Sequence, residues 1–152
     1  MTRTTIAVFA SLMSISVASH AGGPTLMVAT NAHLHRQILV DAAGRTVYMF
    51  TLDPRDSSTC TTQSPVPGCS KIWPPLVVGG KPVVGRGLDP TRIGTLKRSD
   101  GRLQVTYNGH ALYRFTGYPP TPGDKKPGDV NGQAFEESWY VLGPTGRPIE
   151  RP

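Results

Sequence analysis

One eight-residue segment occurs twice in this chain, and this duplication constrains the fold more than any other feature. Residues 44–51, Gly-Arg-Thr-Val-Tyr-Met-Phe-Thr, return as residues 109–116, Gly-His-Ala-Leu-Tyr-Arg-Phe-Thr. A tryptophan follows each copy, Trp73 after the first and Trp139 after the second. A repeated segment at a fixed offset indicates one structural unit used twice. We therefore expect two tandem repeats, at about residues 24–78 and 90–143.

The composition between these copies favours an all-β fold. The chain contains 17 glycines and 15 prolines, and the short runs between them are rich in Val, Ile, Thr, Tyr and Phe. This pattern is typical of short antiparallel strands and hairpins joined by turns. Asn108-Gly109 is the preferred pair for a two-residue hairpin turn. The expected register pairs Tyr107 with His110, Val105 with Leu112, and Leu103 with Arg114.

The two repeats are predicted to share one core within a single domain, residues 22–152. Each copy alone is too short to bury much apolar surface. Side chains alternate along a strand, so Tyr48 and Phe50 share a face, as do their counterparts in the second copy. The segments containing the two tryptophans are expected to cover these aromatic faces. Long loops rich in proline and glycine are expected to complete the domain.

The two cysteines, Cys60 and Cys69, are predicted to form a disulfide. An even number of cysteines at short spacing most simply pairs in an oxidising compartment. The segment between them has no apolar periodicity, and a cross-link would hold it in place. The spacing differs from that of a redox-active Cys-x-x-Cys pair.

The start of the chain predicts export. Arg3 precedes an apolar run at residues 6–17, and Ser19-His20-Ala21 fits a cleavage site, so residues 1–21 are interpreted as a signal peptide. No cysteine stands at the expected new N-terminus, so we expect a periplasmic or secreted protein without a lipid anchor. No later segment is apolar enough to span a membrane. The net charge is +6, with cations scattered mostly singly, and we expect no nucleic-acid partner.

Residues 48–53, Tyr-Met-Phe-Thr-Leu-Asp, fit the motif Tyr-x-(Phe/Trp/Tyr)-x-x-Asp. With Trp73-Pro74-Pro75-Leu76 downstream, the first copy resembles a bacterial family of predicted secreted or lipoprotein repeats of unknown function. The second copy is similar in Tyr113-x-Phe115 and in the later Gly132 and Trp139, but it has Tyr118 in place of the motif's aspartate. The resemblance implies an envelope location and a repeat fold, and it brings no established activity.

Each residue of the motif allows a structural and a functional interpretation. Asp53 either accepts backbone N–H groups at a turn or presents a carboxylate to a ligand beside Tyr48. The aromatic side chains either form the core or make an exposed platform for a glycan or a protein partner. The residues concerned are Tyr48, Phe50, Trp73, Tyr113, Phe115 and Trp139.

Two groups of residues could bind metal. His33 and His35 would share a face if they lay on a strand, and could then hold copper or zinc, with His110 as a third ligand only if the copies fold over each other. Asp124, Asp129 and Asn131 could offer oxygen ligands to calcium, but the full calcium-loop pattern is absent. The alternative in both cases is an ordinary polar connection.

The sequence contains no motif of a hydrolase, a nucleotide-binding loop or a zinc protease. We therefore predict a non-enzymatic exported envelope protein with a binding or structural role, its aromatic faces or loops contacting an envelope polymer or protein. The alternative hypothesis is a periplasmic copper-binding or redox accessory protein.

Overall fold

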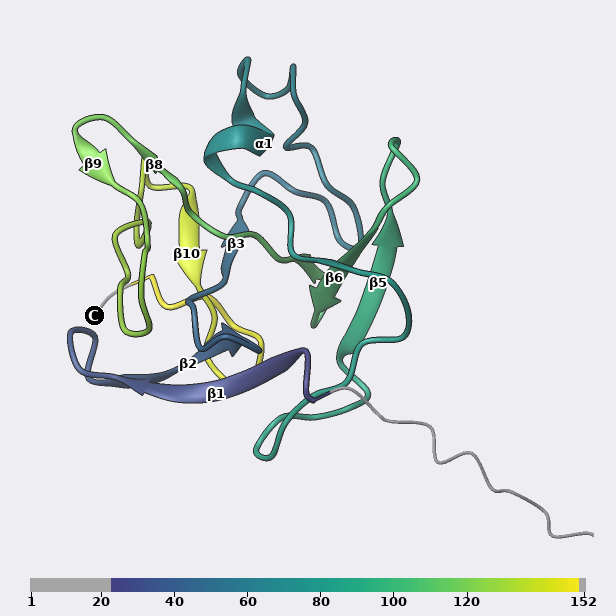
Figure 1. Cartoon of the computed structure of the whole chain (residues 1–152), viewed down its shortest axis with the longest axis vertical. Helices are drawn as coiled ribbons and strands as arrows, with labels where there is room; N and C mark the ends of the chain where they lie inside the picture. The colour runs from purple at the N-terminus through teal and green to yellow at the C-terminus, as the bar shows by residue number, and fades with distance from the viewer. Residues whose placement is uncertain (1–22, 151–152) are drawn as a thin grey trace, which may run out of the picture.

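The computed structural model describes residues 23–150 and confirms the all-β prediction. Its strands are short, and they form small antiparallel sheets (Figure 1). The described part contains no helix that could cross a membrane. The predicted signal peptide, residues 1–21, lies outside the described residues. The elements are β1 (Leu26–Asn31), β2 (Arg36–Asp41), β3 (Tyr48–Phe50), α1 (Cys69–Ile72), β4 (Val77–Val78), β5 (Ile93–Lys97), β6 (Leu103–Tyr107), β7 (His110–Ala111), β8 (Gly117–Tyr118), β9 (Thr121–Pro122) and β10 (Trp139–Val141).

Each copy begins with an antiparallel hairpin. In the first copy β1 pairs with β2, with Met27 opposite Val40. In the second copy β5 pairs with β6, with Thr95 opposite Val105. The two hairpins lie at different edges of the molecule, and β8 and β9 lie at a third (Figure 1).

The predicted turn at Asn108-Gly109 is present, but the predicted register holds for only part of the hairpin. Both turn residues have positive φ, 53° and 80°, as this type of turn requires. Tyr107 pairs with His110, and the Leu112 amide donates to the Val105 carbonyl at 3.0 Å. The pairing of Leu103 with Arg114 is wrong. Strand β4 and the residues before it run beside β6, so Leu103 pairs with Val78, and Arg114 donates to the Pro74 carbonyl.

The segments containing the tryptophans are exchanged between the two copies. Strand β10 of the second copy pairs with β3 of the first, with Trp139 opposite Phe50. In the same way, Pro75 of the first copy bridges to Tyr113 of the second. The backbones of Tyr48 and Tyr113 also exchange two hydrogen bonds of 2.9 Å. Because each copy completes the sheet of the other, the core belongs to both.

The core has two parts, which lie on opposite faces of the repeated strands. Tyr48, Phe50 and their counterparts belong to a mainly aromatic cluster, which the tryptophans complete. Val47, Met49 and Leu112 belong to a mainly aliphatic cluster. This division follows from the alternation of side chains along a strand.

Candidate functional site

The aromatic residues of the repeat motif are buried in the core. Tyr48 and Tyr113 have no exposed surface, and Trp139 keeps 3% of its surface. These tyrosines therefore cannot serve as an exposed platform for a ligand. Their positions correspond to the core interpretation of the motif.

Four of these rings form one continuous stack. Phe50 lies 4.2 Å from Trp139, Trp139 lies 3.9 Å from Trp73, and Trp73 lies 4.3 Å from Phe115, measured between ring centroids. The two indole planes are parallel to within 1°. Residues of the first and second copies alternate along the stack. The rings cover one another's faces, so mainly their edges remain available for other contacts.

The hydroxyl of each repeat tyrosine donates a hydrogen bond to a carboxylate. Tyr113 of the second copy donates to Asp53 Oδ2 of the first, at 2.5 Å. Tyr48 of the first copy donates to Asp124 Oδ2 of the second, also at 2.5 Å. Asp53 also accepts hydrogen bonds from the amide and hydroxyl of Thr59. The motif aspartate thus serves a turn and the opposite copy, rather than Tyr48.

Asp124 occupies in the second copy the position that Asp53 occupies in the first. The Asp53 amide donates to the Phe50 carbonyl at 3.2 Å, and the Asp124 amide donates to the Phe115 carbonyl at 3.0 Å. The sequence comparison missed this match because the β8–β9 hairpin lies between Phe115 and Asp124. Tyr118, which stands at the motif's aspartate position, lies in that hairpin and is 51% exposed.

Burial controls the ionisation of these groups. It raises the pKa of the Tyr48 and Tyr113 hydroxyls, and the neighbouring carboxylates raise both pKa values further. Burial also raises the pKa of Asp124, although the hydrogen bond from Tyr48 acts in the opposite direction. Both tyrosines consequently stay protonated and act as hydrogen-bond donors.

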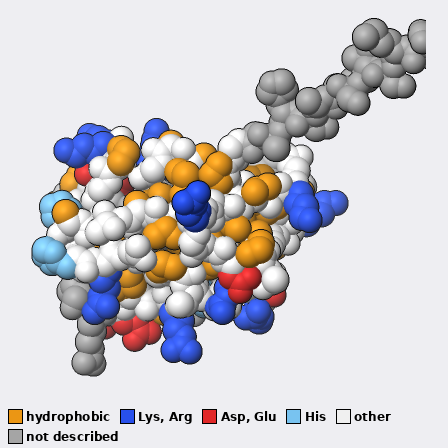
Figure 2. Space-filling view, turned by 90° about the horizontal axis from the view of Figure 1, so that it is seen from below, with side chains coloured by type: hydrophobic (Ala, Val, Ile, Leu, Met, Phe, Trp, Pro, Cys, Tyr) orange, Lys and Arg blue, Asp and Glu red, His pale blue; other side chains and the backbone are white. Residues whose placement is uncertain are grey.

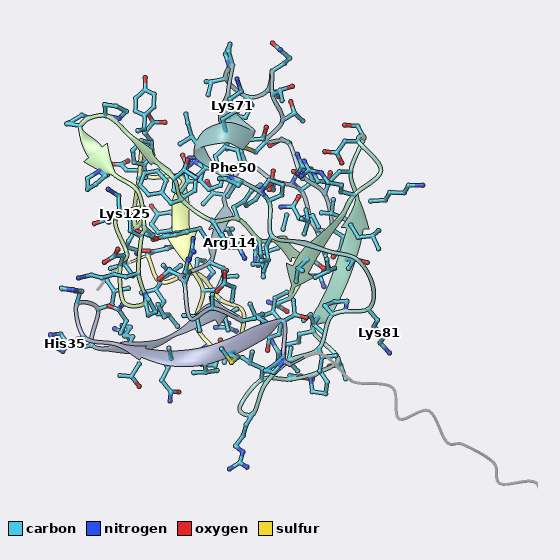
Figure 3. The ribbon with its side chains drawn as sticks, in the orientation of Figure 1. His35, Phe50, Lys71, Lys81, Arg114 and Lys125 are labelled. Carbon is cyan, nitrogen blue, oxygen red and sulfur yellow. A yellow bond between two sulfur atoms is a disulfide. The ribbon has the colours of Figure 1, made fainter. Side chains whose placement is uncertain are left out.

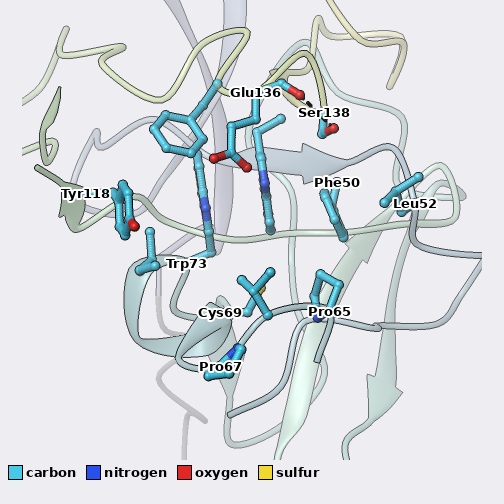
Figure 4. Close-up of a pocket in the computed structure, with 13 residues that line it drawn as sticks. Phe50, Leu52, Pro65, Pro67, Cys69, Trp73, Tyr118, Glu136 and Ser138 are labelled. Carbon is cyan, nitrogen blue, oxygen red and sulfur yellow. Dashed lines mark hydrogen bonds between the residues drawn. The ribbon is translucent and has the colours of Figure 1, made fainter. Parts of the chain in front are cut away.

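An apolar cleft lies beside this aromatic stack, and we refer to it as the aromatic cleft. Its volume is about 480 Å³. Figure 4 shows Phe50 and Trp73 edge-on, with Pro65 and Pro67 facing them across the cleft. The residues that line it are Phe50, Leu52, Pro65, Val66, Pro67, Cys69, Ile72, Trp73, Tyr118, Phe135, Glu136, Ser138 and Trp139.

The predicted disulfide supports one wall of the aromatic cleft. Cys60 and Cys69 are bonded, with an S–S distance of 1.99 Å and a Cα–Cα distance of 5.4 Å. The bond closes the loop that contains Pro65, Val66 and Pro67, and α1 begins at Cys69. Because both sulfurs belong to nearly fully buried residues, the bridge fixes this wall to the core.

The opposite side of the cleft has an unusual backbone. Ala134, Glu136 and Glu137 have φ values of 56°, 49° and 52°, a left-handed conformation that costs an L-residue about 1 kcal/mol or more. Successive turns within residues 130–139 hold this conformation. The strained segment places Phe135 and Glu136 at the cleft. Such strain is often found at functional sites.

The predicted copper ligands lie elsewhere. His33 and His35 belong to the exposed turn between β1 and β2, so the alternation of a strand, which the copper hypothesis required, does not place them on one face. The Asn31 side-chain oxygen accepts hydrogen bonds from the His33 and Leu34 amides and so shapes this turn. Figure 3 shows His35 at the tip of the hairpin, directed away from the body of the protein. Within residues 23–150, no group of three or more His, Cys, Asp or Glu side chains could hold a metal ion.

The two carboxylates considered for calcium, Asp124 and Asp129, accept hydrogen bonds within the protein. Asp124 binds Tyr48 and the Asn131 amide, and Asp129 accepts the amides of Lys125 and Lys126. These contacts correspond to an ordinary loop. On the face shown in Figure 2, Lys and Arg side chains lie mostly around the edge, and apolar groups gather nearer the centre.

Neither a curated protein nor a solved structure shows significant similarity to this chain. The resemblance inferred from the repeat motif is nevertheless confirmed by a family comparison. Residues 94–142, which lie within the second copy, match the sequence model of a family described as a secreted repeat of unknown function.

Proposed function

We propose that this chain is an exported, non-enzymatic binding protein whose ligand site is the aromatic cleft. The cleft itself is the observation that carries the proposal. Ligand sites are typically concave, mainly apolar and about 300–1,000 Å³ in volume, with a few polar groups. The match to a secreted repeat family supports the exported location.

The rim of the cleft is more apolar than folding alone requires. Leu52, Val66 and Tyr118 are 64%, 54% and 51% exposed, and all three line the cleft. Exposed apolar side chains that gather around a concavity commonly mark a binding site. The disulfide on one side and the strained segment on the other keep this concavity open before a ligand arrives.

The proposal can be tested with an apolar fluorescent dye, anilinonaphthalene sulfonate, and the chain's own tryptophans. Both tryptophans of the sequence line the cleft, so a ligand there changes the intrinsic emission directly. We expect dye binding to quench tryptophan emission. We also expect Val66→Asp to weaken dye binding at least tenfold, because it places a charge on the rim.

Val83→Asp is the matched control. Val83 is also exposed, at 51%, but it lines a different depression beside the linker between the copies. The control should bind the dye as the unmodified protein does. Dye binding that is lost in Val83→Asp and kept in Val66→Asp would contradict the proposal.

A further inference from the structure

We infer that the aromatic cleft binds an extended, apolar peptide segment that carries one basic side chain. This inference rests on the proposed function and names the class of ligand. It draws on three features of the cleft: the ring edges that face it, the indole N–H groups, and a single acidic side chain.

The stacked rings favour a peptide over a sugar. Sugar rings pack against exposed aromatic faces, but the faces of Trp73 and Trp139 are covered by each other and by Phe50 and Phe115. The edges carry the positive side of the ring quadrupole. They therefore attract acceptor oxygens, such as the backbone carbonyls of an extended chain.

The indole N–H groups provide directional donors for such carbonyls. Trp73 and Trp139 are 2% and 3% exposed, yet neither N–H donates a hydrogen bond to any described residue. Buried indole N–H groups usually have an acceptor. Among the described residues, Nε of Arg98 is the only side-chain nitrogen or oxygen that is both fully buried and without a hydrogen-bond partner. The two indole nitrogens have no partner either, and they therefore cannot be fully buried and remain accessible to solvent. Grooves lined by Trp, Tyr and Pro bind proline-rich, extended peptides in this way.

The charge of the cleft indicates that its ligand carries a basic side chain. Glu136 alone carries a charge among the described residues that line the cleft. Its carboxylate forms no ion pair within residues 23–150. Figure 4 shows this carboxylate directed toward the aromatic row. In a chain with a net charge of +6, an unpaired acid beside an apolar cleft favours a cationic group on the ligand.

The test uses intrinsic tryptophan emission and three probes without tryptophan. The first is a synthetic seven-residue peptide of Pro and Leu with one Arg, the second has Glu in place of that Arg, and the third is a chitin oligosaccharide. We expect saturable binding of the Arg peptide and at least tenfold weaker binding of the other two. Equal or tighter binding of the oligosaccharide would overturn the inference.

A pair of neighbouring variants tests the role of the acid. Glu136→Gln should weaken binding of the Arg peptide about fivefold, as expected for the loss of an exposed ion pair of about 1 kcal/mol. Glu137→Gln is the control, because Glu137 is also exposed and has the same backbone conformation but does not line the cleft. Equal effects of the two variants would contradict a specific contact.

The outcomes separate this inference from the proposed function. If dye binding is sensitive to Val66→Asp but no peptide binds, the inference of a peptide ligand is overturned and the cleft remains a site for another apolar molecule. Absence of both dye and peptide binding would overturn both proposals. Arg-peptide binding that persists in Val66→Lys, where the added cation repels the peptide's Arg, would show that the peptide binds outside the cleft and would also overturn the inference.

Discussion

The two copies reach the same contact by different routes. In the first copy, Asp53 follows Phe50 by three residues and binds the tyrosine of the other copy. In the second copy, the β8–β9 hairpin separates Phe115 from Asp124, yet Asp124 binds Tyr48 at the same distance. The invariant feature is a tyrosine hydroxyl that donates to a carboxylate across the interface between the copies. The spacing of the motif is one way to achieve it.

The copies also differ in what they place against the aromatic stack. In the second copy, Gly132 lies so close to Trp73 that an added Cβ would be 2.7 Å from the ring, and this side is filled. In the first copy, the disulfide loop stands away from the rings and leaves the aromatic cleft. Both copies therefore line the cleft, but the first copy alone contributes a disulfide-closed loop to it.

The largest expected effect comes from the base of the inserted hairpin. A Cβ at Gly123 would lie 2.2 Å from the Thr116 carbonyl oxygen, so Gly123→Ala must separate the two ends of the hairpin and displace Asp124. We expect a loss of about 3 kcal/mol in the free energy of unfolding, measured with urea. Gly80→Ala, where nothing lies within 4 Å, should change it by less than about 0.5 kcal/mol. Equal losses would show that the insertion does not position the carboxylate.

The second largest effect is expected from removing the disulfide, which closes a loop of the first copy and has no counterpart in the second. Replacing both Cys60 and Cys69 by Ser should cost about 2–3 kcal/mol, since closure of this short loop no longer restricts the unfolded chain. The same variant should weaken dye binding in the aromatic cleft, because Pro65 and Pro67 lose their support. An unchanged free energy of unfolding with unchanged dye binding would mean that the loop is held by other contacts.

The sequence allowed the strands and the aromatic core to be predicted, because both depend on local patterns. Alternation placed Tyr48 and Phe50 on one face, and Asn108-Gly109 identified its turn. The exchange of the tryptophan segments could not be predicted in this way. Trp139 pairs with Phe50 of the first copy rather than with the equivalent Phe115 of its own copy. The two copies have the same local pattern, so the sequence does not indicate which of these strands Trp139 joins.

The candidate site was harder to predict than the core. Asp124 lacks the motif spacing, so the sequence suggests only a calcium ligand at this position. Glu136 lies at the cleft because of three left-handed residues that are not glycine, and no local sequence pattern signals that conformation. His33 and His35 lie in a turn shaped by the side chain of Asn31, which corresponds to the polar-connection alternative rather than to the strand that a shared metal face requires. A single polar side chain therefore decided between two local structures.

Removal of each tyrosine hydroxyl tests the equivalence of the two copies. Tyr48→Phe and Tyr113→Phe should each cost about 2 kcal/mol, the usual value for a hydrogen bond to a charged group. The two losses should agree to within about 0.5 kcal/mol if the copies contribute equally. Urea unfolding measures both, and circular dichroism checks that the strands remain. A large loss for one variant alone would show that the copies contribute unequally.

The smallest effect concerns the pH dependence of the second copy. Burial raises the pKa of Asp124 in the folded protein above its unfolded value. Its contribution to stability is therefore full below the unfolded pKa and is lost as the pH rises through the folded pKa. Asp129, which lies in the same loop, behaves oppositely. Hydrogen bonds from the Lys125 and Lys126 amides lower its pKa, so its contribution to stability is lost as the pH falls through that pKa.

Carbon-detected NMR titration of the Asp side chains, together with urea unfolding between about pH 3 and pH 7, measures both effects. We expect the stability of the unmodified protein relative to Asp124→Asn to decrease as the pH rises through the Asp124 pKa. In Tyr48→Phe, the Asp124 pKa should rise further, because the hydrogen bond that favours its charged form is lost. An Asp124 pKa that is unchanged in Tyr48→Phe would mean that the tyrosine does not stabilise the carboxylate, and the match between the two copies would then be one of shape alone.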